Sequence, residues 1–548
     1  MVLCFSRAIV ALNLCASARS KELHYLSGMN RLTTVLALVA ACIGPLCGAQ
    51  NSNISSGFVF EGEPYIAQNP VNPQHLVVAW MGFVFNSGSG LTIKTKTSFD
   101  GGLSWSSAVA IPHEDEAYAS ADPSLSIATN GDVLLCYIDH SQDPYGGGVY
   151  FRKSTDGGLS WGNAVLAVDI FADGEEFPID RPWFSMSADG QWVYLTTMPP
   201  SFAAMPNRPY LWQSNDGGAT WSDFEFVDGV SGLVGNLVAR PMAPPAMGTS
   251  YAYTIYPSYV FGQNPLPTII LSRQALGSST REYFTALAAS NDSEPGSAKM
   301  GYKLLVDPSN EEHLSAVFVV GEGSDLDIQM IDSYDGGSSW SDLQRVNDDA
   351  IGNNRMQDLV WADYDEDGDL VVSWRDRRNA DAAGYEQPTQ IYCAYRASGE
   401  SSFSPNFALT DQATPHNAIL NENGNDFMCI AFHQDTLHAV WGSTTDGSLD
   451  IWYTRRAIAD EVSEVPVLLT SESAGFFVVR QNKALTVSLY EPGIIQRVQV
   501  KTMSGGLVVD QSVQADQTSI GIDRWPPGCY IVSVEFQGKT LSQKYMIW

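Results

Sequence analysis

Short apolar runs recur along the chain, and each is bounded by Gly, Pro, Asn or Asp. Seven such runs, among them "HLVVAWMG" from His75 and "DLVVSWRD" from Asp369, are each followed by a loop and a second segment such as "LTIKTKTS". The other five begin at Asp132, Trp192, Ser250, His313 and Thr436. An earlier segment such as "PYIAQNPVNP" precedes each pair, and a short one such as "AVAIP" follows. The segment lengths and turn residues favour strands, so each unit supplies four antiparallel β-strands.

One eight-residue turn recurs as "SFDGGLSW" from Ser98, "STDGGLSW" from Ser154, "SNDGGATW" from Ser214 and "SYDGGSSW" from Ser333. Its aspartates are separated by 56, 60 and 119 residues, so the last interval spans two units, one of which has lost the turn. A repeat of about 60 residues with four strands is typical of a propeller blade. The pattern predicts an all-β fold, a seven-bladed propeller, with six blades as the alternative.

The repeated turns are expected to be structural. Each Asp is placed to accept backbone N–H groups, Gly supplies positive φ, and Trp can pack between sheets. The turn joins the third strand of a blade to the fourth, whereas ligands are expected at the opposite face. The structural aspartates are Asp100, Asp156, Asp216 and Asp335.

The S-x-D-x-G-x-x-W turns resemble the Asp boxes (BNR repeats) of the sialidase superfamily of β-propellers, over about residues 57 to 460. The resemblance implies three arginines that clamp a substrate carboxylate, a Tyr nucleophile with a Glu, and an Asp acid/base. The first arginine normally opens the first blade, where this chain reads "EGEPYIAQNP", with no basic residue between Arg31 and Lys94. The family's catalytic residues are therefore not carried over to this chain.

Other charged residues stand at the starts of the innermost strands and in the loops on that face. Two or three arginines could hold an acidic sugar while a carboxylate or His140 moves protons. The alternative is that these charges pair with one another and tie neighbouring blades together. The catalytic candidates are Arg181, Arg240, Arg377, Asp139, His140 and Asp180, and the substrate-binding candidates are Glu63, Asp122, Arg375, Asp376 and Arg378. Asp143, Glu322, Asp325, Asp358 and Asp426 are expected on the same face.

The segment "DYDEDGD" has the D-x-D-x-D-G spacing of a calcium loop but lacks the Glu at position twelve, where Trp374 stands. Its carboxylates are Asp363, Asp365, Asp367 and Asp369. A structural calcium ion and an ordinary acidic turn are the two interpretations. No cofactor is required.

Residues 1–49 form a signal region, because "MNRLTTVLALVAACIGPLCGAQ" joins a basic residue, an apolar run and small residues before a cut after Ala49. Met29 is the expected start, and a lipoprotein-like Cys42 is the rival interpretation. Removing the region takes away four basic residues and one acidic residue, so a net charge of −31 becomes −34. Such a charge disfavours nucleic acid as a partner. The apolar run is too short for a stable membrane span.

Residues 50–465 are assigned to the propeller and residues 466–548 to a separate module. The segments "MSGGLVV" and "PPGCYIVSVEFQGKTLSQKYMIW" resemble the type A sorting domain of the type IX secretion system of Bacteroidota. The resemblance implies an immunoglobulin-like β-sandwich that directs export through the periplasm and across the outer membrane. A plain immunoglobulin-like binding module is the alternative.

Together these features predict a secreted or cell-surface protein that recognises an extracellular glycan or glycoprotein. Hydrolysis of that glycan, by an exo-sialidase-like reaction, stays an open alternative, as does a non-catalytic adhesin or protein-binding scaffold.

Overall fold

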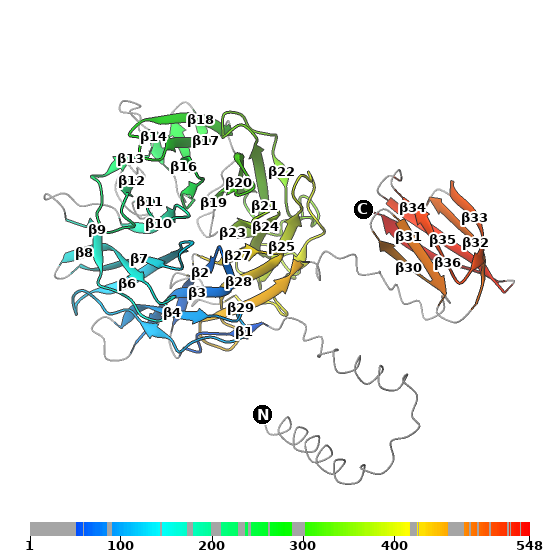
Figure 1. Ribbon diagram of the computed structural model, residues 1–548, viewed down its shortest axis with the longest axis horizontal. Helices are drawn as coiled ribbons and strands as arrows, with labels where there is room; N and C mark the ends of the chain where they lie inside the picture. The colour runs from blue at the N-terminus through cyan, green and yellow to red at the C-terminus, as the bar shows by residue number, and fades with distance from the viewer. Residues whose placement is uncertain are drawn as a thin grey trace, which may run out of the picture. The chain divides into compact units, whose positions relative to one another are not determined.

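The computed structural model describes residues 51–547 with gaps, the longest of which are 172–178, 199–209, 228–235, 288–301, 417–424 and 459–475. The predicted signal region, Met29 and Cys42 lie outside the described residues. Within the described part no helix is both long and apolar enough to cross a membrane. That part forms nine β-sheets, of which seven are the blades of a propeller (Figure 1).

The first three blades follow one another along the chain in simple order. Blade 1 consists of β2 (Glu61–Asn69), β3 (Asn72–Phe83), β4 (Leu91–Ser98) and β5 (Val109–Ala110). Blade 2 consists of β6 (Ala119–Ile127), β7 (Val133–Gln142), β8 (Tyr145–Ser154) and β9 (Val165–Asp169). Blade 3 consists of β10 (Asp180–Met186), β11 (Val193–Met198), β12 (Tyr210–Ser214) and β13 (Glu225–Phe226).

The next three blades repeat this order, with one extra strand in blade 4. Blade 4 consists of β14 (Asn236–Val238), β15 (Ala246–Met247), β16 (Tyr251–Val260), β17 (Asn264–Ala275) and β18 (Arg281–Leu287). Blade 5 consists of β19 (Tyr302–Asp307), β20 (Asn310–Glu322), β21 (Asp325–Ser333) and β22 (Gln344–Arg345). Blade 6 consists of β23 (Gln357–Tyr364), β24 (Leu370–Asp376), β25 (Gln390–Arg396) and β26 (Phe407–Ala408).

Blade 7 contains strands from both ends of the propeller sequence. It consists of β27 (Cys429–His433), β28 (Thr436–Ser443) and β29 (Asp450–Ala457), with β1 (Ser52–Asn53) as its outer strand. Ser52 pairs with Tyr453, and the N–H of Ile54 donates to the carbonyl of Ile451 at 2.9 Å. These bonds close the ring, and the prediction of a seven-bladed all-β propeller is confirmed.

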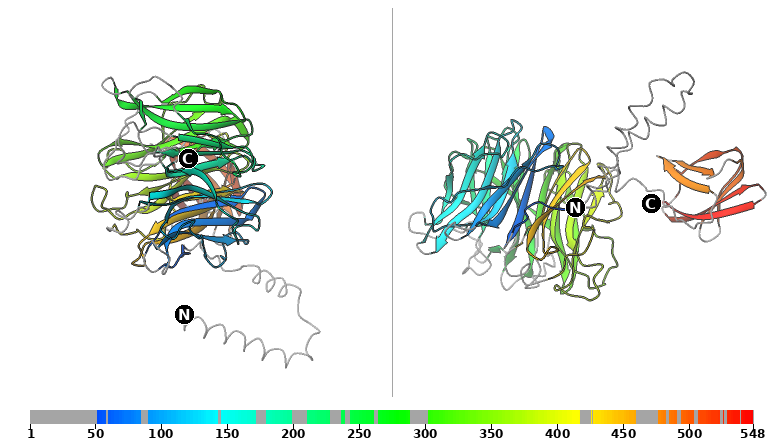
Figure 2. Two further views of the ribbon diagram at one scale, coloured as in Figure 1. Left: turned by 90° about the vertical axis from the view of Figure 1, so that its left-hand side faces the viewer. Right: turned by 90° about the horizontal axis from the view of Figure 1, so that it is seen from below.

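Seven innermost strands line the centre, namely β2, β6, β10, β15, β19, β23 and β27, and each contacts the next around the ring. The second strand of a blade is covered on both faces by neighbouring blades. Leu76, Val77, Val78 and Ala79 of β3 are therefore all fully buried, which explains why these strands read as continuous apolar runs. Figure 2 shows the strands running across the thickness of the propeller.

The Asp boxes form nearly identical turns at the edges of four blades. In blade 1 Asp100 Oδ1 accepts from Ser98 Oγ and from the Ser104 N–H, both at 2.8 Å, and the same bonds recur in the other three boxes. In blade 2 the indole N–H of Trp161 donates to Thr95 of blade 1 at 3.1 Å. The boxes thus shape their own turns and join neighbouring blades.

The last seven strands form two antiparallel sheets that share a core of their own. One sheet contains β30 (Phe476–Gln481), β31 (Ala484–Leu489) and β34 (Gln517–Gly521). The other contains β33 (Leu507–Ala515), β32 (Ile495–Thr502), β35 (Gly528–Phe536) and β36 (Lys539–Ile547). Val487, Val498 and Val532 are fully buried between them. The assignment of this module as a sorting domain stays a prediction.

Candidate functional site

Four innermost strands carry the same local distortion near their first residues. The pairing of β2, β6, β10 and β23 with the next strand shifts register at this point, which is the sign of a β-bulge. The bulges hold Glu63, Asp122, Arg181 and Leu359 at φ of 55°, 52°, 48° and 57°, in the left-handed region. We call this end of the innermost strands the bulge end. Such strain costs about 1 to 3 kcal/mol per residue and collects at functional sites.

The opposite end of the innermost strands carries the turns to the second strands, and we call it the turn end. In blade 1 the N–H of Gly101 in the Asp box donates to the carbonyl of Gln74 at 2.9 Å, just after the turn between β2 and β3. The Asp boxes therefore lie at the turn end, away from the bulges, as their expected structural role requires.

Arg181 joins three blades at the bulge end. Its backbone N–H donates to Asp122 of blade 2 at 3.0 Å. Its guanidinium carbon lies 5.7 Å from the ring centroid of Trp183 in its own blade and 6.0 Å from that of Phe427 just before β27 of blade 7. Trp183 and Phe427 are themselves in contact, with ring centroids 5.5 Å apart.

Aromatic rings continue from this cluster into the centre of the propeller. The ring centroid of Trp183 is 6.4 Å from that of Trp361, which packs edge-on against Tyr65 at 5.5 Å. All three rings are buried. These buried aromatic side chains lie between the bulge end and the turn end.

The densest cluster of arginines in the sequence pairs with carboxylates of the chain. Arg375 donates through Nε to Oδ1 of Asp358 at 2.7 Å and through a terminal nitrogen to Oδ2 at 2.5 Å, and Arg377 reaches Oδ1 at 3.0 Å. Tyr385 stacks near both guanidinium groups. Burial alone would raise the pKa of Asp358, but the charges of Arg375 and Arg377 lower it to about 2.

Arg378 points to a separate pair of carboxylates. It donates to Oδ2 of Asp376 at 2.9 Å and to Asp348 at 2.6 Å, and its guanidinium lies 4.2 Å from the ring centroid of Tyr392. Asp376 is buried and also accepts from the indole N–H of Trp374 at 2.7 Å. Burial raises the pKa of Asp376 despite the charge of Arg378. Such contacts are expected if the charged side chains stabilise the loops at blade 6.

In blade 2, Asp139 is fully buried and organises the loop that precedes β6. Its carboxylate pairs with His113 Nδ1 at 2.7 Å, and it accepts from Ser120 Oγ at 2.9 Å and from the N–H of Glu114 at 3.0 Å. His140 is half-buried next to it. Burial lowers the pKa of His140, and the charges of Asp139 and Asp122 oppose this change. His140 is therefore mainly neutral near pH 7, as a proton acceptor must be.

The remaining candidates are placed as follows. Asp180 is half-buried at the start of β10, and Asp325 accepts from the N–H of Asn354 at 2.9 Å. Arg240, Asp426, Asp143 and the side chain of Glu322 lie outside the described residues. The bulge end brings together Asp122 and Arg181, with Glu63 at the corresponding position of blade 1. The catalytic and substrate-binding roles of all these residues stay predictions.

The predicted calcium loop forms the turn between β23 and β24, at the turn end. Carboxylate oxygens of Asp365, Asp369 and Asp435 lie within 4.8 Å of one another, with Asp435 contributed by the neighbouring turn of blade 7. Burial, the hydrogen bond with Asp367 and the charges of Asp367 and Asp369 raise the pKa of Asp365 to about 8. Asp363 instead accepts from the N–H of Phe432 at 3.0 Å. The calcium ion stays a prediction.

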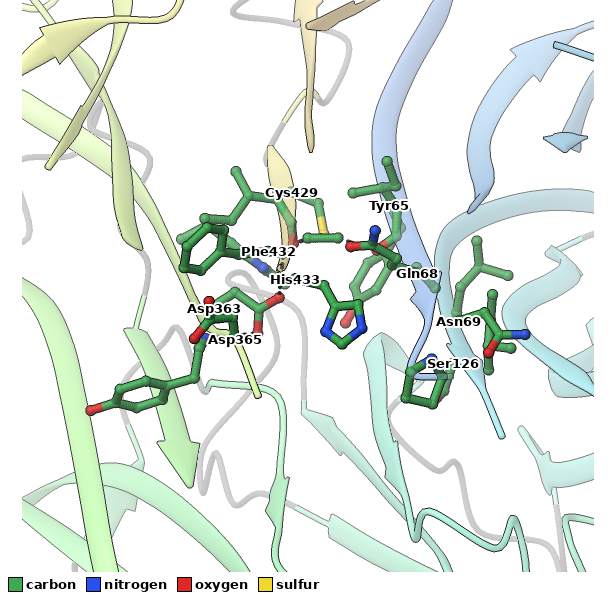
Figure 3. A pocket seen from close by; sticks show the side chains of 18 of the residues that line it. Tyr65, Gln68, Asn69, Ser126, Asp363, Asp365, Cys429, Phe432 and His433 are labelled. Carbon is green, nitrogen blue, oxygen red and sulfur yellow. Dashed lines mark hydrogen bonds between the residues drawn. The ribbon is translucent and has the colours of Figure 1, made fainter. Parts of the chain in front are cut away.

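A cavity of about 390 Å³ opens inside the ring at the turn end. Figure 3 shows Asp363, Asp365 and Phe432 on one side of it and Tyr65, Gln68 and Ser126 on the other, with His433 between them. Lys303 and Trp361 also line it.

Sequence reasoning missed Trp183, Phe427, Lys303 and Trp361. Aromatic and lysine side chains in strands give no sign of their own that they face a channel. The repeated acidic or basic residue before Pro64, Pro123 and Pro182 was a signal for the bulges, because it interrupts three innermost strands at the same position.

Comparisons with known proteins give only distant structural matches. No protein-family model matches the chain, and no curated protein does either. Among solved structures it is similar to the NanB sialidase of Streptococcus pneumoniae, at 12% identity over 80% of this chain and 74% of that one, with a TM-score of 0.41. It is also similar to a phage phi92 endosialidase, at 10% identity over 91% and 87%, with a TM-score of 0.43. A GH93 α-L-arabinofuranosidase of Fusarium graminearum matches at 12% identity over 76% and 99%, with a TM-score of 0.43.

Proposed function

We propose that the propeller recognises an extracellular glycan at its bulge end. The observation that carries the proposal is the guanidinium of Arg181, which lies over Trp183 at 5.7 Å and over Phe427 at 6.0 Å. The buried rings of Trp183 and Phe427 fix the position of this half-buried guanidinium, which can bind a hydroxyl or carboxylate group of a sugar. Asp122 supports this position from the adjacent strand by accepting the backbone N–H of Arg181 at 3.0 Å, and Glu63 stands at the same position of blade 1.

The arginine contacts of blade 6 favour glycan binding without hydrolysis. A clamp for a substrate carboxylate needs guanidinium groups whose donors face the substrate. Arg375 and Arg377 share Asp358, and Arg378 binds Asp376 and Asp348. Hydrolysis is therefore the second candidate activity, to be measured after glycan binding. A protein-binding scaffold is the outcome expected if no glycan binds.

The test is a glycan array probed with the full-length chain, followed by calorimetric titration of the glycans that bind. Arg181→Ala should weaken binding about tenfold or more, because it removes a charge-assisted contact worth about 1.5 to 3 kcal/mol. Arg273→Ala is the matched control, since Arg273 also packs on two rings, 5.2 Å from Tyr251 and 4.8 Å from Phe284, in blade 4. It should bind like the wild type.

Two results would contradict the proposal. One is the absence of binding to any glycan, and the other is equal affinity of folded Arg181→Ala and the wild type. Mass spectrometry of the bound glycans after incubation separates recognition from hydrolysis, because only hydrolysis releases a sugar.

We further propose that the chain reaches the cell surface or the medium through the type IX route. The apolar segment ending near Ala49 and the terminal "PPGCYIVSVEFQGKTLSQKYMIW" support this proposal. Mass spectrometry of the exported protein should find Gln50 as its first residue and a C-terminus near residue 465. Export of a chain that keeps residues 1–49 would refute it.

A further inference from the structure

Lys303 projects from β19 of blade 5 into the cavity at the turn end, on the other side of the aromatic cluster from the proposed glycan site. Its Nζ lies 4.3 Å from the ring centroid of Trp361. Among the described residues Lys303 forms no ion pair, and the carboxylate of Asp363 acts on its charge across the cavity. Burial lowers the pKa of Lys303, which increases the fraction of neutral amine. The neutral amine is the nucleophilic form of lysine.

The charges around the cavity decide which ligands can approach the amine. Asp363, Asp365 and Glu366 line it with Lys303, and Nδ1 of His433 lies 2.6 Å from Glu366. Asp365 is mainly protonated near pH 7 because its pKa is raised to about 8, so an anionic ligand would meet the carboxylates of Asp363 and Glu366 and would be repelled. A neutral electrophile is not repelled, and a volume of about 390 Å³ is sufficient for a small molecule.

We propose that Lys303 is a covalent binding site for small neutral aldehydes and ketones, including open-chain reducing sugars. The amine nitrogen forms a bond to the carbonyl carbon while the C=O π bond breaks, and a proton lost by the nitrogen is gained by the oxygen. The hydroxyl group of the resulting carbinolamine takes up a second proton from the solvent and leaves as water, as the nitrogen lone pair forms the C=N bond. The product is a protonated imine, whose positive charge is stabilised by the carboxylate of Asp363 and the face of Trp361.

Reductive trapping tests the proposal on the full-length chain. The chain is incubated with dihydroxyacetone and sodium cyanoborohydride, and the modified lysines are identified by peptide mass spectrometry over time. Lys303 should be labelled on the order of tenfold faster than Lys153, and its rate should saturate with ketone concentration. Lys153 is the exposed reference, with 49% of its side chain accessible and Nζ 2.7 Å from Asp132.

Lys96 is the matched control for burial. Burial lowers its pKa too, but its Nζ donates to the carbonyl of Ile54 at 2.7 Å and it does not line the cavity. If a lowered pKa alone explained fast labelling, Lys96 would be labelled as fast as Lys303. That result would show that the cavity around Lys303 does not contribute, and the proposal would be wrong.

A second probe tests the charge argument. Pyruvate is also a ketone but carries a carboxylate, so it should label Lys303 several-fold more slowly than dihydroxyacetone does, with no such preference at Lys153. Labelling of Lys303 at the rate of Lys153, or without saturation, would overturn the proposal, and this comparison needs the wild-type chain alone.

Discussion

The buried carboxylate of Asp358 is the most informative residue to change, because the two interpretations of blade 6 predict different results. It is fully buried and binds Arg375 through two bonds, at 2.7 and 2.5 Å, and Arg377 at 3.0 Å. In Asp358→Asn the shape is kept while both guanidinium groups lose their counter-charge. Breaking a buried ion pair in this way costs about 3 to 5 kcal/mol. A folded domain has only about 5 to 15 kcal/mol of stability, so the loss should be severe.

The pH dependence of stability gives a second, independent value for the free energy that Asp358 contributes. The charges of Arg375 and Arg377 overcome the effect of burial and lower the pKa of Asp358 from 3.8 to about 2. A lowered pKa means that this stabilisation is fully present above about pH 4 and is lost as the pH falls towards 2. The shift corresponds to about 2 to 3 kcal/mol. Asp358→Asn should lack this acid-dependent part.

Urea denaturation of the full-length chain, followed by tryptophan fluorescence and circular dichroism between pH 2 and 7, measures both effects. Glu282→Gln is the control, because it breaks an arginine–carboxylate pair at the surface, where Glu282 is 55% exposed and bonds Arg273 at 2.7 Å. Such a pair contributes about 0 to 1 kcal/mol. A loss below about 1 kcal/mol in Asp358→Asn, with an unchanged acid transition, would refute a structural role for this cluster.

Three further changes test the scaffold. Asp156→Ala removes the acceptor of Ser154 Oγ at 2.8 Å and of the Ser160 N–H at 2.9 Å, and urea denaturation should show a loss of about 1 to 2 kcal/mol with unchanged glycan binding. Burial alone would lower the pKa of His313, but its hydrogen bonds to Asp307 and Asp332 raise it. Its stabilisation is therefore present below pH 6.5 and lost at higher pH, so the wild-type melting temperature should fall from pH 6 to 8 more than that of His313→Gln. Calcium should raise the melting temperature relative to EDTA if the predicted loop binds it, and Asp365→Asn should abolish the difference.

The number and order of the blades could be predicted because the repeat constrains them. The spacing of the Asp boxes gives the length of one unit, and the doubled interval between Asp216 and Asp335 reveals a blade without a box. The closure of the ring could not be predicted. Ser52 and Asn53 form only two pairs with β29, and such a short polar segment carries no strand pattern of its own.

The candidate site was predictable only in part. The starts of the innermost strands follow from the repeat, so Glu63, Asp122 and Arg181 could be assigned to one end. Which charges pair with each other depends on side-chain directions within a bulge. There two residues of the bulged strand lie opposite one residue of the next strand, so side chains no longer alternate between the two faces of the sheet. For this reason the sequence could not show which carboxylates the three arginines of "WRDRR" bind, namely those of Asp358, Asp376 and Asp348.

The bulge end differs from the turn end because the same distortion recurs there in several blades. Each positive φ at Glu63, Asp122 or Arg181 costs free energy that an unbroken strand would avoid, and each of these residues stands before a proline. At the turn end, positive φ at Gln434 and Asp435 belongs to the single turn between β27 and β28, and hydrogen bonds of the Asp boxes hold the turns of four other blades. Relaxing one bulge gives a direct test of this contrast. Pro182→Ala should cost at most about 1 kcal/mol of stability, because the unfolded chain gains freedom, yet weaken glycan binding, because Arg181 would no longer be held over Trp183. A variant that loses stability but keeps its affinity would show that the bulges serve the fold and not the ligand.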